Sequence, residues 1–106
     1  MTIQHIIDAL GARIVHLEEP ERDVTGGYCG DFLSNVISKA PADSVWFTVM
    51  NNQNVAAVQT LADISLTVLC EGVEPDEHLA ARAKEKGLNM VVTDLPVYEA
   101  VKAVNG

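Results

Sequence analysis

The chain has 106 residues, 48% of them hydrophobic and 21% charged, which predicts one globular domain over residues 1–106 and excludes a disordered or fibrous protein. Fifteen acidic residues against seven basic ones give a net charge of −8, which repels a phosphate backbone and argues against nucleic acid as a partner. No apolar run approaches the roughly 20 residues that span a bilayer. The first residues show no signal-peptide pattern, so we expect no membrane partner and a cytoplasmic protein.

The first elements in chain order are a helix and a strand. Thr2 is placed to cap a helix with apolar residues at helical spacing, and Gly11 is placed to end it. Residues 12–17 have the composition of a strand, and residues 18–21 form an acidic loop. This loop leads into the glycine-rich segment of the chain.

That segment, residues 23–27, contains two adjacent glycines that free the backbone for positive φ, so it predicts a tight turn. Such a turn either positions a strand against a helix or forms an anion-binding nest at a helix N-terminus, and both alternatives remain open. Behind it, Asp31 is a suitable N-cap for an amphipathic helix that Pro41 ends. The apolar stripe of this helix consists of Phe32, Leu33, Val36 and Ile37.

From residue 44 onward, strands and helices alternate. Residues 44–50 are almost continuously β-branched and aromatic, which predicts the central strand, buried on both faces and holding Trp46 in the core or an interface. The expected order continues with a helix to residue 62, a strand at 64–70, a helix from Pro75 to Gly87, a strand at 89–93 and a helix capped by Asp94. Right-handed crossovers turn this order into a single small α/β domain: a mostly parallel sheet of about four to five strands with helices packed on its faces.

In such a sheet, ligands bind beyond the carboxyl ends of the strands. Asn and Thr side chains there, together with backbone amides, can hold a phosphate, a ribose or an amide, and the phosphate would rest mainly on backbone amides. The candidate ligand-binding residues are Thr25, Gly26, Gly27, Asn51, Asn52, Asn54, Thr93 and Asp94. The competing interpretation makes Asn51, Asn52 and Asp94 helix caps and turn formers.

Motifs for catalysis and metal binding are missing from the sequence. There is no G-x-x-x-x-G-K-[ST] loop, no G-x-S-x-G elbow and no H-E-x-x-H pair, and the three histidines fall in different elements. Cys29 and Cys70 have no C-x-x-C spacing and lie in or beside apolar segments, where we expect reduced thiols. We therefore expect no catalytic residue, no metal and no cofactor.

Several short motifs together resemble the DRTGG domain family, and the resemblance covers nearly the whole chain. They are Asp23, Thr25-Gly26-Gly27, Gly30-Asp31-x-Leu33-Ser34, a strand ending in Thr48, Asn54-x-x-Ala57-Val58 and a late Thr93-Asp94. Val24 stands where the family has an arginine, and the nearest arginine is Arg22. The resemblance implies a small non-catalytic α/β module, found beside CBS domains in regulatory regions of some pyrophosphatases and inside some phosphate acetyltransferases, and related to the N-terminal domain of HPr kinase.

Three hypotheses for function follow. The first is a non-catalytic regulatory or sensory module that forms a homodimer and binds a nucleotide or phosphorylated metabolite at the strand ends. The second is an accessory subunit of a phosphoryl-transfer or redox enzyme complex that acts through protein–protein contacts. The third is a small independent enzyme with Asp31 or Asp94 as general base, which is disfavoured because nothing in the sequence tunes either carboxylate.

Overall fold

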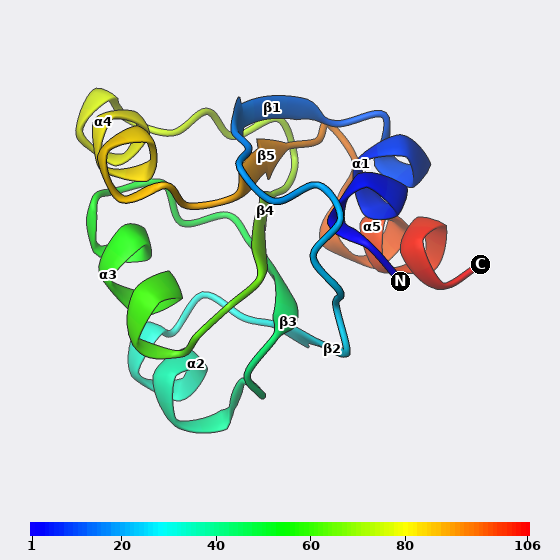
Figure 1. Ribbon diagram of the computed structural model, residues 1–106, viewed down its shortest axis with the longest axis horizontal. Helices are drawn as coiled ribbons and strands as arrows, with labels where there is room; N and C mark the ends of the chain where they lie inside the picture. Colours follow the sequence, from blue (N-terminus) through cyan, green and yellow to red (C-terminus); the bar gives the residue numbers. More distant parts are fainter.

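The computed structural model describes residues 1–106 as a five-stranded sheet with helices on both faces. Figure 1 shows α1 and α5 on one face, and α2, α3 and α4 on the other. The helices are α1 (Ile3–Leu10), α2 (Leu33–Lys39), α3 (Asn54–Leu61), α4 (Glu77–Lys86) and α5 (Val97–Asn105). The strands are β1 (Arg13–His16), β2 (Gly26–Cys29), β3 (Ser44–Thr48), β4 (Leu66–Leu69) and β5 (Met90–Val92). The predicted α/β class is confirmed.

The strands lie in the order β1-β5-β4-β3-β2, in which β2 to β5 are parallel and β1 runs antiparallel to β5. The sheet therefore has two edges, β1 and β2. All residues of β3 are buried as predicted, but β4 is the central strand. A buried run in the sequence indicates an interior strand without fixing its place in the sheet.

Two apolar clusters hold the layers together. The first lies between the sheet and α1 with α5, and includes Ile6, Phe47 and Val91; the second lies beneath α2, α3 and α4, and includes Trp46 and Leu79. Successive side chains along a strand point to opposite faces of the sheet, so neighbouring residues of a strand belong to different clusters. This alternation explains why the interior strands are apolar throughout.

Helices begin and end where the sequence predicts when the capping interaction depends on residues close together in the chain. The Thr2 side chain accepts a hydrogen bond from the His5 amide, and Gly11 and Gly87 end their helices in the left-handed conformation. At α4 the N-cap is Asp76, so Pro75 precedes the helix instead of lying in its first turn. None of the five helices is both long and apolar enough to span a bilayer.

Two predicted caps are wrong. The N-cap of α2 is Phe32, because the Asp31 carboxylate accepts hydrogen bonds from the Thr48 hydroxyl and the Val49 amide instead. The N-cap of α5 is Pro96, so the Asp94 side chain does not cap that helix. At Asp31, the neighbouring strand β3 therefore takes the carboxylate that the sequence assigns to the helix.

The predicted apolar stripe of α2 is also only partly buried. Val36 is fully buried, whereas Phe32 is 67% and Ile37 43% exposed. This helix has seven residues and covers little of the sheet face. Helical periodicity identified the stripe correctly but not the amount of protein available to cover it.

Candidate functional site

The carboxyl ends of the parallel strands bring part of the predicted site together. Asn51 and Asn52 follow β3 and lead into Asn54 at the start of α3, while Thr93 and Asp94 follow β5. All five residues lie at the end of the sheet where the sequence predicted a ligand.

Most of these polar side chains already have partners within the chain. The Asn51 side-chain amide donates to the Glu74 carbonyl at 2.9 Å, and Asn52 Oδ1 accepts from the Asn54 amide at 2.9 Å. Thr93 Oγ1 accepts from the Leu95 amide at 3.3 Å. These bonds brace the loops, so Asn52 acts as a turn former and not as the cap of α3, whose N-cap is Gln53. Asn51 ties its own loop to the loop that holds Glu74.

The charge at this end of the sheet is unfavourable for phosphate. Asp31, Glu71, Glu74 and Asp94 all follow strands here or lie in the next loop. Arg13, at the start of β1, donates to both carboxylate oxygens of Glu74, and this hydrogen bond raises the pKa of Arg13. Because the nearby arginine is paired, the carboxyl ends present a mainly acidic rim.

A hollow beside this rim has the opposite charge. It has a volume of about 240 Å³ and lies between the start of α3 and the last turns of α4, lined by Gln53, Asn54, Ala56, Ala57, Arg82 and Lys86. Arg82 and Lys86 are one helical turn apart and therefore lie on the same side of α4. Both are exposed, and neither forms an ion pair within the chain.

The backbone amides at the start of α3 already donate hydrogen bonds to acceptors within the chain. The amide of Asn54 donates to the Asn52 side chain, that of Val55 to the Asn52 carbonyl and that of Ala56 to the Gln53 carbonyl. An anion in the hollow would therefore contact the side chains of Asn54, Arg82 and Lys86. The prediction that a phosphate rests mainly on backbone amides is not supported at this helix.

Thr25, Gly26 and Gly27 lie at the opposite end of the sheet from the other candidate residues. The Thr25 amide donates to the Asp43 carbonyl at 3.0 Å, and Gly26 and Gly27 pair with Ser44 and Val45 as the first residues of β2. Neither glycine has positive φ. The predicted tight turn and the helix N-terminal nest are therefore both wrong: the glycines form an edge strand.

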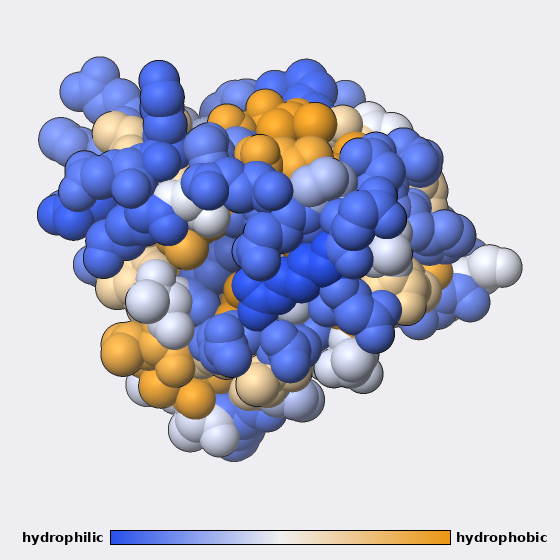
Figure 2. All heavy atoms as spheres, in the orientation of Figure 1, coloured by the Kyte–Doolittle hydropathy of each residue, from blue (hydrophilic) through white to orange (hydrophobic).

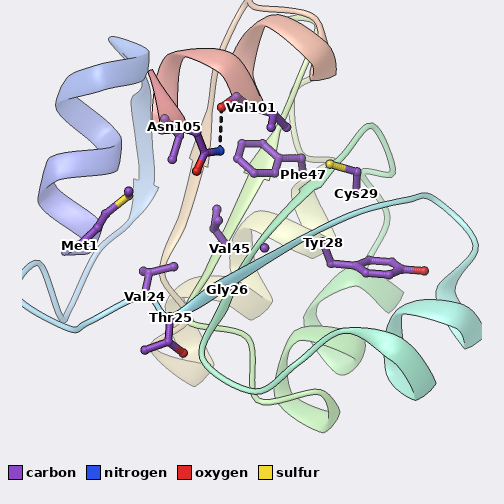
Figure 3. A pocket seen from close by; sticks show the side chains of 12 residues that line it. Met1, Val24, Thr25, Gly26, Tyr28, Cys29, Val45, Phe47, Val101 and Asn105 are labelled. Carbon is purple, nitrogen blue, oxygen red and sulfur yellow. Dashed lines mark hydrogen bonds between the residues drawn. The ribbon is translucent and has the colours of Figure 1, made fainter.

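These glycines border an apolar groove with a volume of about 390 Å³, here called the β2 groove. Figure 3 shows Val45 and Phe47 on its floor, with Met1 and the end of α5 around it. Its lining consists of Met1, Val24, Thr25, Gly26, Gly27, Tyr28, Cys29, Val45, Phe47, Val101, Val104 and Asn105. No side chain of Asp, Glu, Lys, Arg or His lines it, so the groove suits apolar contacts.

Val24 and Arg22 both make contacts within the fold. Val24 is buried in the cluster under α1 and α5 and lines the β2 groove. Arg22 donates to Glu19 at 3.2 Å, Asp43 at 3.0 Å and Asp63 at 3.5 Å. It thereby ties the loop before β2 to the turns before β3 and β4, and does not point to a ligand site.

The three histidines lie on three different elements, α1, β1 and α4. His16 contacts Glu18 at 2.8 Å, whereas His5 and His78 are exposed on α1 and α4. Asp31 serves as a structural acceptor. No group of three or more His, Cys, Asp or Glu side chains is arranged to hold a metal ion.

The fold is a small α/β domain with a mostly parallel sheet. Among solved structures, the chain is similar to the CBS and DRTGG domains of the regulatory region of Clostridium perfringens pyrophosphatase, crystallised with its activator, diadenosine tetraphosphate. The TM-score is 0.80 at 13% identity, and the match covers 97% of this chain but 45% of that one. At this identity the likeness shows the fold alone and supports a DRTGG-like fold. No protein-family model and no curated protein sequence matches the chain.

Proposed function

We propose that this chain is a non-catalytic regulatory module that binds a nucleotide or another phosphorylated metabolite and acts as a homodimer. The observation that carries the ligand proposal is the hollow between α3 and α4, where two unpaired cations face an amide side chain in a protein of net charge −8. The similarity in fold to a regulatory region that was solved with a nucleotide activator is consistent with it.

In this proposal the phosphate contacts Arg82 and Lys86, and Asn54 hydrogen-bonds the neighbouring part of the ligand. Asn51, Asn52 and Thr93 hold the loops at the carboxyl end of the sheet through their side-chain hydrogen bonds, and Asp94 lies in the loop after β5. Thr25, Gly26 and Gly27 are separate from the ligand, because they lie at the other end of the sheet. They are proposed to serve the dimer instead.

A thermal-shift panel at constant protein concentration tests ligand binding. The panel contains adenine and guanine nucleotides, dinucleotides and phosphorylated metabolites, with the matching nucleosides as controls and a chelator present so that metal bridging cannot contribute. A ligand at about 100 times its dissociation constant adds about 2.7 kcal/mol of stability, which raises the midpoint by several degrees. A shift with nucleotides and none with nucleosides supports the proposal, and a flat panel contradicts it.

A second function is favoured by exposed apolar side chains on α2 and α3. Phe32 at the N-cap of α2, Ile37 in that helix and Leu61 at the end of α3 are exposed, Leu61 by 70%. Figure 2 shows hydrophobic atoms over this part of the molecule. We propose as the alternative an accessory subunit that docks this surface on a phosphoryl-transfer or redox enzyme.

Purification from the native source distinguishes the two functions. The accessory-subunit function requires a stoichiometric enzyme partner that a Leu61→Asp variant no longer retains. A homodimer without a partner in the same preparation counts against it.

A further inference from the structure

The free edge of β2 has backbone groups without a strand partner. In the parallel register that pairs Gly26 with Ser44, the Gly30 amide donates to the Phe47 carbonyl. Because bonding residues alternate along a strand, Gly26 and Tyr28 direct their amides and carbonyls toward β3, and Gly27 and Cys29 direct theirs away from it. We propose that β2 pairs antiparallel with β2 of a second copy of this chain, so that two sheets join across a two-fold axis. This inference names the surface of the proposed homodimer and rests on that part of the proposed function.

The two edges of the sheet differ in protection against pairing. On β1 the register shifts between Ile14 and His16, and Arg13 forms an ion pair with Glu74 beside the strand. Irregular register and charged side chains are common protections of edge strands. The β2 strand, Gly-Gly-Tyr-Cys, has a regular register with β3 and no charged residue, so it lacks both protections.

Charge favours a second copy at this surface. Two molecules of net charge −8 repel each other through most of their surfaces. The β2 groove has no Asp, Glu, Lys, Arg or His side chain, and the amino group of Met1 at its border is paired with Asp23 at 3.0 Å. The lining of the groove itself therefore brings no carboxylate into the contact.

The glycines allow the close approach that the pairing requires. With Gly27 and Cys29 directed outward, a two-fold axis at Gly27 places Gly27 opposite Gly27 of the second copy, in a hydrogen-bonded pair with Cα atoms about 5.5 Å apart. Each Gly26 then lies opposite Tyr28 of the second copy in a non-hydrogen-bonded pair with Cα atoms about 4.5 Å apart, so the aromatic ring lies opposite a residue without a side chain. The two β2 grooves meet on the same side of the joined sheet, so their apolar floors become one shared surface.

Sedimentation under reducing conditions over the micromolar range, with Gly27→Asp and Leu61→Asp variants, tests this interface. A Cβ at Gly27 meets no atom closer than 3.6 Å and its φ is not positive, so the aspartate fits the monomer. In the dimer it faces its own copy, and we expect the dimer dissociation constant to rise by at least about tenfold. Leu61→Asp adds the same charge on the exposed α2–α3 surface and leaves the dimer intact.

Hydrogen exchange gives a readout that needs no variant. The amides of Gly27 and Cys29 exchange more slowly as the dimer forms, whereas the Tyr28 amide, directed toward β3, is protected at every concentration. Three results overturn the inference: a monomer throughout the range, a dimer that Leu61→Asp disrupts and Gly27→Asp does not, or unprotected Gly27 and Cys29 amides in the dimer. Ligand binding is measured independently, because the hollow at Arg82 lies on the opposite face of the sheet.

Discussion

Neutralising the two cations of the hollow between α3 and α4 should weaken the binding of phosphorylated ligands. The perturbation is the double variant Arg82→Gln, Lys86→Gln, which keeps a polar side chain at each position. Both residues are exposed at the end of α4, so neither substitution leaves a buried group unpaired. The helix should therefore remain folded while the hollow loses its positive charge.

The expected loss follows from Coulomb's law at an open site. A unit charge about 4 Å from a phosphate is worth about 1 kcal/mol in water and about 4 kcal/mol at a partly shielded protein surface. Exposure of both side chains places the effect near the lower value. Two contacts then contribute about 2 kcal/mol, or roughly a 30-fold change in the dissociation constant.

The assay is calorimetric titration of each variant with the nucleotide that gives the largest thermal shift. The matched control is Lys39→Gln, Lys84→Gln, which removes the same two charges from exposed positions outside the hollow. The control should change affinity by less than about threefold, because neither side chain lines the hollow and exposed charges that make no direct contact are weakened by water and salt. Equal weakening by the two double variants would refute the reasoning, as would unchanged binding by the hollow variant.

Three further predictions concern the scaffold. Arg22→Met should lower the free energy of unfolding by about 1–2 kcal/mol, because it leaves three carboxylates without their shared cation. Urea titrations should show a smaller loss at high salt, and a loss below about 0.3 kcal/mol would contradict this role. Asn89 is 2% exposed, and its side chain accepts hydrogen bonds from the amides of Glu18 and Glu19 and donates one to the Ser65 carbonyl. Asn89→Asp should lower the free energy of unfolding by about 2–4 kcal/mol at neutral pH, and by less near pH 4, when the new carboxyl can be protonated. A loss that does not depend on pH would argue against this explanation. Burial raises the pKa of Cys70 to about 12, so between pH 9 and 12 the thiol ionises in the unfolded chain, near its ordinary pKa of 9.0, and stays neutral in the folded one. The free energy of unfolding should therefore fall in this range by up to about 1.4 kcal/mol per pH unit, and by less in Cys70→Ala. The same fall in both proteins would refute the linkage.

Local chemistry made much of the fold predictable from the sequence. The Thr2 cap, the glycines that end α1 and α4, and the apolar runs of β3 and β4 each depend on residues close in sequence or on burial of a whole strand. These features gave the alternation of strands and helices from residue 44 onward. Short-range signals of this kind survive in almost any tertiary context.

The features that the sequence did not predict depend on long-range packing. Gly26 and Gly27 permit positive φ but do not require it, and pairing with β3 holds them extended. Asp31 could cap a helix, yet Thr48 is within reach across the sheet. The conformation at these positions is therefore decided by neighbours far along the chain.

The candidate site shows the same division. Asn51, Asn52, Asn54, Thr93 and Asp94 were placed correctly at the carboxyl end of the sheet, because parallel strands bring those loops to one end. Arg82 and Lys86 were not among the predicted site residues. The available signal was their spacing of one helical turn, but the packing of α4 beside α3 could not be deduced from it.

The most direct test of the proposed regulatory ligand site is an NMR titration of the uniformly labelled chain with the selected nucleotide. It follows every backbone amide and therefore locates the bound ligand without relying on variants. The proposal predicts saturable shifts concentrated in residues 53–57 and 82–86, with small changes elsewhere. Shifts confined to the acidic rim around Asp31, Glu71 and Asp94, or no shifts at saturating nucleotide, would contradict the claim that this chain binds phosphorylated ligands between α3 and α4.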